Sequence, residues 1–160
     1  MKEQPTIAVI GLGYVGLPLA VAFAEKYQVI GFDINTHRIA ELNSGQDSTL
    51  EVSPEALQEV LNNKGNGLTV TDDPSLMKEA SVYIVTVPTP TNKHNQPVLT
   101  PLEKASETVG KVLKEGDVVI YESTVYPGVT EDICVPILEQ TSKLAFNTHF
   151  FQRFNGERLT

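Results

Sequence analysis

The chain has 160 residues and a mass of 17.5 kDa, which suits one domain and leaves no room for a second of ordinary size. Its 12 basic and 20 acidic side chains give a net charge of −8, so nucleic acid and anionic lipid are unfavourable partners. The single cysteine, Cys134, cannot form an internal disulfide, and the histidines lack metal-ligand spacing. No apolar run approaches the roughly 18 residues of a membrane span. These features predict a cytoplasmic protein with no metal and no nucleic-acid or membrane partner.

Short β-rich runs alternate with amphipathic stretches along the chain, a pattern typical of a parallel sheet covered by helices. Strands are predicted at residues 6–10, 29–32, 68–71, 81–87 and 118–121. Helices are predicted at 17–26, after Asn35, after Ser53, at 74–79, after Thr100, and at 129–138, where Pro136 should disturb the helix. The residues Thr100-Pro101-Leu102-Glu103 have the form of a capping box.

A glycine motif, Gly11-x-Gly13-x-x-Gly16, follows the first predicted strand and opens the first helix. Gly11 permits a tight turn, Gly13 lets the backbone approach a pyrophosphate, and Gly16 lets the helix pack on the strand. Glycine-rich turns in other α/β proteins match the same string, and FAD and S-adenosylmethionine use related loops. With the alternation of strands and helices, the motif predicts an α/β fold: a Rossmann-like, doubly wound, mainly parallel sheet with helices on both faces.

Asp33 ends the second predicted strand, where a carboxylate can accept hydrogen bonds from an adenosine ribose and repel a 2′-phosphate. Its alternative role is that of an ordinary Asp at a strand end, capping the next helix. The position favours NAD over NADP, although Arg38 nearby keeps NADP open.

Two loops also follow predicted strands, one at residues 87–91 and one at 122–124. Ligands bind beyond the carboxyl ends of strands in open α/β sheets, so both loops are expected to face the cofactor. These loops supply Val87, Thr89, Ser123 and Thr124 as candidate contacts. Alternatively, the prolines end the strands and the hydroxyls satisfy local backbone groups.

Four ordered motifs resemble the N-terminal domain of the UDP-glucose/GDP-mannose dehydrogenase family. They are Gly11-Leu12-Gly13-Tyr14-Val15-Gly16-Leu17-Pro18-Leu19-Ala20, Gly31-Phe32-Asp33-Ile34-Asn35, Val85-Thr86-Val87-Pro88-Thr89-Pro90-Thr91 and Glu122-Ser123-Thr124-Val125-Tyr126-Pro127-Gly128. The last motif looks most like the branch that acts on UDP-N-acetylhexosamines in the synthesis of bacterial surface polysaccharides. The resemblance predicts an NAD-binding domain at residues 1–151 and a divergent tail at 152–160.

This resemblance implies an activity and a set of site residues. The family oxidises the C6 hydroxyl of a nucleotide sugar to a carboxylate in two NAD-dependent hydride transfers, through a thioester on a cysteine. By position, the cofactor residues would be Gly11, Gly13, Tyr14, Val15 and Gly16 at the pyrophosphate, Asp33 and Arg38 near the adenosine ribose, and Thr89 at the nicotinamide side. Thr124 would lie near the nicotinamide ribose and help to place a catalytic water, and Glu157 would activate water for thioester hydrolysis.

The resemblance weakens at the end of the chain. After Phe151 the family pattern Gly-Tyr-Ser-Pro-Glu-Arg is replaced by Gln152-Arg153-Phe154-Asn155-Gly156-Glu157-Arg158, in which only the Glu-Arg pair remains. The alternative for Glu157 is an exposed tail residue. The central dimer helix, the nucleophilic cysteine and the UDP-sugar domain are expected outside these residues, and Cys134 is predicted to be buried.

Three hypotheses for the function follow from this comparison. The chain is the cofactor half of a UDP-N-acetylhexosamine or UDP-hexose 6-dehydrogenase, or it is a truncated, catalytically inactive NAD-binding module. Thirdly, it is an interaction protein that self-associates through apolar faces that the missing domain would cover.

Overall fold

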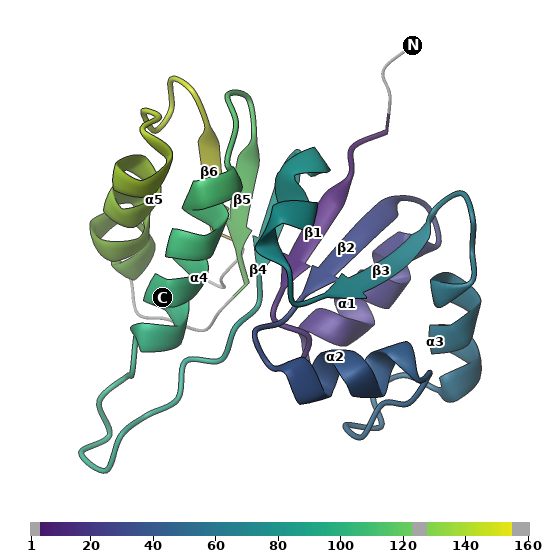
Figure 1. The fold of residues 1–160 in the computed structure, drawn as a ribbon. Coiled ribbons are helices and arrows are strands. Elements are labelled where there is room, and N and C mark those ends of the chain that lie inside the picture. Colours follow the sequence, from purple (N-terminus) through teal and green to yellow (C-terminus); the bar gives the residue numbers. More distant parts are fainter. Residues whose placement is uncertain (1–3, 123–127, 155–160) are drawn as a thin grey trace.

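The computed structural model describes residues 4–122 and 128–154, which form a six-stranded sheet with all neighbouring strands parallel (Figure 1). The strand order is β3-β2-β1-β4-β5-β6. The strands are β1 (Ile7–Ile10), β2 (Gln28–Phe32), β3 (Gly67–Thr71), β4 (Val82–Val85), β5 (Val118–Tyr121) and β6 (Phe151–Phe154). Because the order runs outward in both directions from β1 and β4, the predicted doubly wound, Rossmann-like fold is confirmed.

Helices cover both faces of the sheet. On one face lie α1 (Gly16–Ala24), α2 (Thr36–Asn43) and α3 (Pro54–Leu61). On the other lie the 3₁₀ helix η1 (Pro74–Glu79), α4 (Thr100–Val112), the π-helical turn η2 (Thr130–Cys134) and α5 (Val135–Ser142). An apolar core lies on each face of the sheet, and alternate residues of β1 belong to different cores. Ile7 and Val9 belong to the core beneath α1, α2 and α3, and Ala8 and Ile10 belong to the core on the other face. All four are buried, which explains why β1 is a continuous apolar run.

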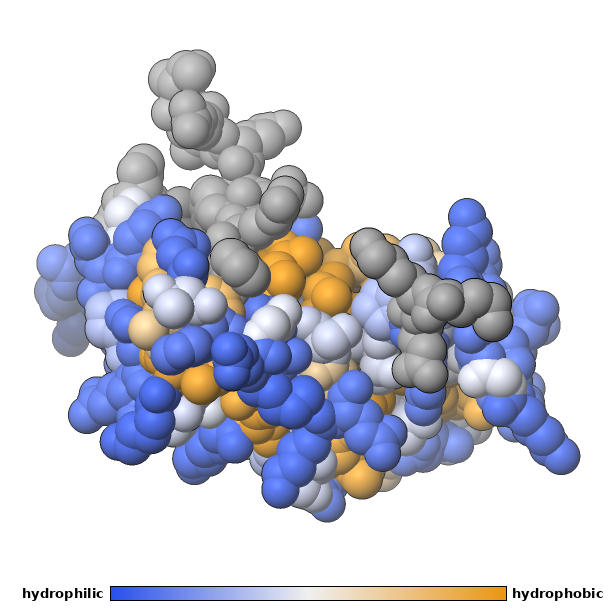
Figure 2. Space-filling model, turned by 90° about the horizontal axis from the view of Figure 1, so that it is seen from above, coloured by the Kyte–Doolittle hydropathy of each residue, from blue (hydrophilic) through white to orange (hydrophobic). Residues whose placement is uncertain are grey.

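The surface combines polar flanks with apolar areas. Seen from above the view of Figure 1, apolar side chains lie across the middle of the molecule and hydrophilic ones border them (Figure 2). Among residues 4–122 and 128–154, no helix combines the length and the hydrophobicity needed to cross a membrane.

Most predicted strands agree with the structure within one residue, but two differences stand out. The strand predicted at 81–87 covers only Val82–Val85, although it is central as expected. The sequence predicts no strand at β6, because Gln152, Arg153 and Phe154 depart from the family motif and belong to the predicted tail. Its backbone pairs in register with β5, from Val118 opposite Phe151 to Tyr121 opposite Phe154.

The helix ends test the predicted caps. Asn35 and Ser53 cap α2 and α3 as predicted, since their side chains accept backbone N–H groups of the first helical turn. The prediction of a capping box at Thr100 is wrong. Leu99 is the N-cap residue of α4, has a helical backbone conformation and leaves the helix without a side-chain cap, because Thr100 is already inside the helix. The helix predicted at 129–138 is a π-helical turn followed by α5, with Pro136 in the first turn of α5.

The cap assignment predicts different effects for two substitutions. Ser53→Ala removes the acceptor for the Ala56 N–H, at 3.2 Å, and should lower the free energy of unfolding by about 1 kcal/mol. Thr100→Ala removes no cap and should change it by less than about 0.5 kcal/mol. Urea unfolding followed by circular dichroism measures both values. Equal losses in the two variants would contradict the assignment of the α4 cap to Leu99.

Candidate functional site

A cleft of about 960 Å³ opens at the carboxyl ends of β1 and β4, where the strand order reverses. Its walls come from the loop between β1 and α1, the end of β2 with the start of α2, the exit from β4, and the first turns of α4. This is the position at which doubly wound sheets bind their ligands. The cleft is therefore the candidate site.

The glycine loop has the steric properties that its motif requires. Gly11 has a φ of +98°, which side-chain-bearing residues rarely adopt, so the turn there needs glycine. A Cβ atom on Gly16 would lie 1.7 Å from the Gly11 carbonyl oxygen and 2.4 Å from the Thr86 Oγ1. A Cβ atom on Gly13 would meet no atom within 4 Å, so the space in front of this residue is open.

Thr86, the residue after β4, is bonded to the glycine loop. Its hydroxyl lies 2.7 Å from the Gly11 carbonyl oxygen and 3.0 Å from that of Ile10, so it donates to the turn itself. Thr86 also lines the cleft, although it is absent from the predicted site residues. Its place immediately before Val87 in the third motif was the available signal.

Asp33 is bonded both to the glycine loop and to the entry of α2. One carboxylate oxygen accepts the Leu12 N–H at 2.9 Å, which ties the end of β2 to the glycine loop. The other accepts the Asn35 N–H at 2.9 Å, at the entry to α2. Asp33 also lines the cleft, so its carboxylate is near any ligand there as well as near the helix start.

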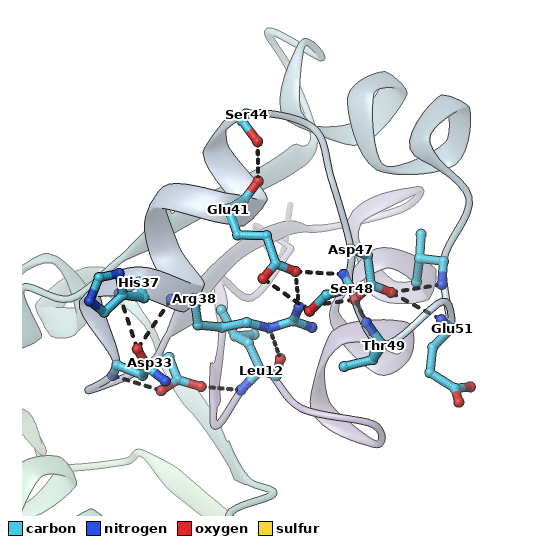
Figure 3. A network of polar contacts seen from close by, with 12 residues as sticks. Leu12, Asp33, His37, Arg38, Glu41, Ser44, Asp47, Ser48, Thr49 and Glu51 are labelled. Carbon is cyan, nitrogen blue, oxygen red and sulfur yellow. Dashed lines mark hydrogen bonds and ion pairs between the residues drawn. The ribbon is translucent and has the colours of Figure 1, made fainter.

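Arg38 lies nine-tenths buried in the wall of the cleft, inside a polar network (Figure 3). Its Nε donates to the Leu12 carbonyl oxygen at 2.8 Å. Its Nη1 lies 2.7 Å from Oε1 of Glu41 and 3.0 Å from Oδ1 of Asp47. Its Nη2 is buried without a hydrogen-bond partner. The charge of this arginine is therefore matched inside the protein.

Asp47 organises the turn that supplies this second carboxylate. Its buried side chain accepts the backbone N–H groups of Thr49, Glu51 and Val52, each at 3.0 Å. Burial by itself raises the pKa of Asp47, but hydrogen bonds outweigh that effect and lower the pKa to about 2. The turn also holds Leu50 at a φ of +58°, with its side chain exposed. A hydrogen bond from the Ser48 N–H lowers the pKa of Glu41.

The structure brings most of the predicted cofactor residues to this one cleft: Gly11, Gly13, Tyr14, Val15, Asp33, Arg38, Val87 and Thr89 line it. Gly16 lies behind the loop, against the Gly11 carbonyl. Ser123, Thr124 and Glu157 lie outside the described residues. Thr86 and Lys104 are among the lining residues that sequence reasoning missed. Glu122 also lines the cleft, and it begins the loop at 122–124 that was expected to face the cofactor.

The described residues offer neither a metal centre nor an accessible thiol. Residues 4–122 and 128–154 contain no group of three or more metal-ligating side chains. Cys134 is buried, as predicted, and burial raises the pKa of its thiol. A buried thiol of raised pKa is a poor nucleophile, so Cys134 is a packing residue.

Residues 5–160 match the model of the UDP-glucose/GDP-mannose dehydrogenase family, NAD binding domain. The chain belongs to this family. It is 58% identical over 153 residues to UDP-N-acetyl-D-glucosamine 6-dehydrogenase of Pseudomonas aeruginosa, covering 96% of this chain and 35% of that protein. It is 53% identical over 157 residues to the Salmonella typhi protein of the same name, covering 98% and 36%. The resemblance inferred from the four motifs is confirmed, and the chain spans about a third of the length of these relatives.

Solved structures give the same result. The UDP-D-ManNAc dehydrogenase from Pyrococcus horikoshii superposes with a TM-score of 0.87 at 39% identity, over 97% of this chain and 37% of that one. A ternary complex of GDP-mannose dehydrogenase from Pseudomonas aeruginosa has a TM-score of 0.83 at 28% identity, over 91% and 34%. The match to an NAD-binding domain supports NAD as the cofactor, in agreement with Asp33 at the end of β2.

The Asp47 network predicts how stability changes in acid. Because the folded pKa is about 2 and the ordinary value is 3.8, its stabilisation is present above pH 3.8 and is lost as the pH falls toward 2. The loss should be about 2 kcal/mol. Asp47→Asn should be less stable than wild type at pH 7 and show a shallower decline below pH 4, measured by urea unfolding.

The exposed Asp72 supplies the control for this measurement. Asp72→Asn removes the same charge outside the network and should retain the acid decline of the wild type. If Asp47→Asn declined as steeply as the wild type, Asp47 would not be the group responsible.

Proposed function

We propose that this chain is the cofactor domain of a UDP-N-acetylhexosamine 6-dehydrogenase and that its cleft binds NAD. The observation that carries the proposal is the convergence of the glycine loop, Asp33 and the β4 exit on one cleft at the reversal of strand order. The choice of sugar is supported by the two relatives named for UDP-N-acetyl-D-glucosamine, at 58% and 53% identity.

The residues present fit a dinucleotide. The pyrophosphate would lie in the open space beside Gly13, at the N-terminus of α1. This helix has no side-chain cap and no acidic residue in its first turn, so its N–H groups and dipole favour an anion there. The Asp33 carboxylate would accept the adenosine ribose hydroxyls. Arg38 would act at this end as a positioning residue, because its Nε holds the Leu12 carbonyl.

The family pattern is the basis on which we assign the nicotinamide end. Val87 and Thr89 lie on the side opposite the β2 end, and Ser123 and Thr124 follow β5 in the sequence. When bound, NAD⁺ supplies the acceptor for the hydride that leaves the sugar. The family pattern supports Thr124 as the residue that places a water and Glu157 as the base that activates it.

The chain by itself is expected to bind NAD without oxidising a sugar. The family chemistry needs a thiolate that attacks the sugar aldehyde, and the single cysteine of this chain is buried. Oxidation of the UDP-sugar is thus the proposed activity of a protein that joins this domain to a sugar site and a reactive cysteine. We further propose a cytoplasmic location, which fits a chain with a single, unpaired thiol.

The Gly13→Ala variant tests the binding of NAD⁺ separately from the stability of the fold. The new methyl group meets no protein atom within 4 Å, so the free energy of unfolding should change by less than about 1 kcal/mol. The methyl group would occupy the space of the pyrophosphate, and the affinity for NAD⁺ should fall by at least about tenfold. Isothermal titration with NAD⁺ and urea unfolding measure the two effects.

Gly65→Ala is the matched control, since its Cβ atom would lie in an exposed turn with only Asn63 at 3.8 Å. This variant should bind NAD⁺ as the wild type does. Wild-type protein that is folded but binds no NAD⁺, or a Gly13→Ala variant with unchanged affinity, would contradict the proposed site.

A further inference from the structure

An arginine at the ribose end of a doubly wound sheet is the residue type that accommodates the 2′-phosphate of NADP. Arg38 lies in that wall of the cleft, so its position alone would permit NADP. Its surroundings point the other way, because two carboxylates from α2 and the following turn engage the same guanidinium nitrogen (Figure 3).

The Arg38 guanidinium has few hydrogen-bond donors left for a ligand. Nε donates to the Leu12 carbonyl oxygen, and Nη1 pairs with both Glu41 and Asp47. Nη2 has no partner, but it is buried. The guanidinium is therefore held in place although its Nη2 has no hydrogen-bond partner. Burying this unpaired nitrogen costs free energy, which the two ion pairs of Nη1 must offset.

The two carboxylates are themselves fixed. Asp47 accepts three backbone N–H groups of its own turn. Glu41 accepts the Ser48 N–H at 2.6 Å with Oε1 and the Ser48 hydroxyl at 3.0 Å with Oε2. Two carboxylates thus engage one guanidinium, and this group of three carries net negative charge. A 2′-phosphate placed here would meet repulsion, and the one Arg38 nitrogen without a partner, Nη2, is buried.

We propose that Glu41 and Asp47 determine the cofactor selectivity of this site: they neutralise the charge of the Arg38 guanidinium in the cleft wall and thereby reject a 2′-phosphate. The inference rests on the proposed binding of NAD and adds to it the residues that exclude NADP. Asp33 faces the ribose directly, whereas Glu41 and Asp47 act through Arg38 and are positioning residues.

Glu41→Gln is the decisive variant. Its amide oxygen can keep both bonds of Oε1, and its amide nitrogen can donate to the Ser48 hydroxyl, so the substitution removes the charge and preserves the contacts. Isothermal titration with NAD⁺ and with NADP⁺ should show a gain in NADP⁺ affinity of about fivefold, with NAD⁺ affinity changed less than about twofold. The gain should shrink at high salt.

Two further variants identify the source of the gain. Adding Arg38→Gln to Glu41→Gln should abolish the gain for NADP⁺, since the guanidinium, whose charge is less neutralised in Glu41→Gln, is the group that attracts the phosphate. Glu115→Gln removes the same charge from an exposed position before β5, far from the carboxyl ends of the strands, and should leave the ratio of the two affinities unchanged.

The outcomes distinguish this inference from the proposed function. If folded wild-type protein binds neither nucleotide, the proposed function fails and the selectivity inference fails with it. If wild type binds NAD⁺ but Glu41→Gln leaves the affinity ratio unchanged, only the selectivity inference is overturned. A gain that persists without Arg38 would likewise overturn it.

Discussion

The close contact between Gly16 and the Gly11 carbonyl is the constraint on which the site depends. Helix α1 can begin directly behind β1 only because no Cβ atom separates it from the turn, where 1.7 Å would be left. Thr86, directly after β4, closes the same contact by donating to the Gly11 carbonyl oxygen. One packing requirement thus joins β1, α1 and β4 and places the N-terminus of α1 at the cleft.

A second set of contacts fixes the other half of the cleft wall to this centre. Leu12 is held from two sides, with its N–H on Asp33 and its carbonyl oxygen on Arg38. Through Arg38 the constraint extends to Asp47 and the turn before α3. Backbone geometry at the glycine loop and charge pairing at the ribose end are therefore parts of one structure, and a change at Asp47 is transmitted to the loop that would hold a pyrophosphate.

Local requirements explain what the sequence predicts well. A tight turn with positive φ, a missing Cβ atom and an N-cap each demand a particular residue type, so Gly11, Gly16, Asn35 and Ser53 could be assigned from their spacing alone. Thr100 has the right residue type but the wrong backbone, because Leu99 is already helical. That conformation depends on how the preceding loop approaches α4, which no local pattern records.

Partnerships between distant segments explain what the sequence did not predict. Asp47 lies in a polar stretch that indicates only a loop, and its role becomes visible when Arg38 is placed beside it. Strand β6 forms by pairing with β5, which precedes α5 in the sequence, whereas β6 follows α5. Lys104 belongs to a helix with an ordinary polar face, and only the packing of α4 brings this residue to the cleft.

Backbone amide shifts in an NMR titration with NAD⁺ test most directly whether NAD binds in the cleft at the glycine loop. The largest shifts are expected at Leu12, Gly13 and Asp33, with amides of α5 unchanged, because the ligand contacts the loop and lies remote from that helix. Shifts confined to α5 or β6, or no shifts from a folded chain at millimolar NAD⁺, would contradict it.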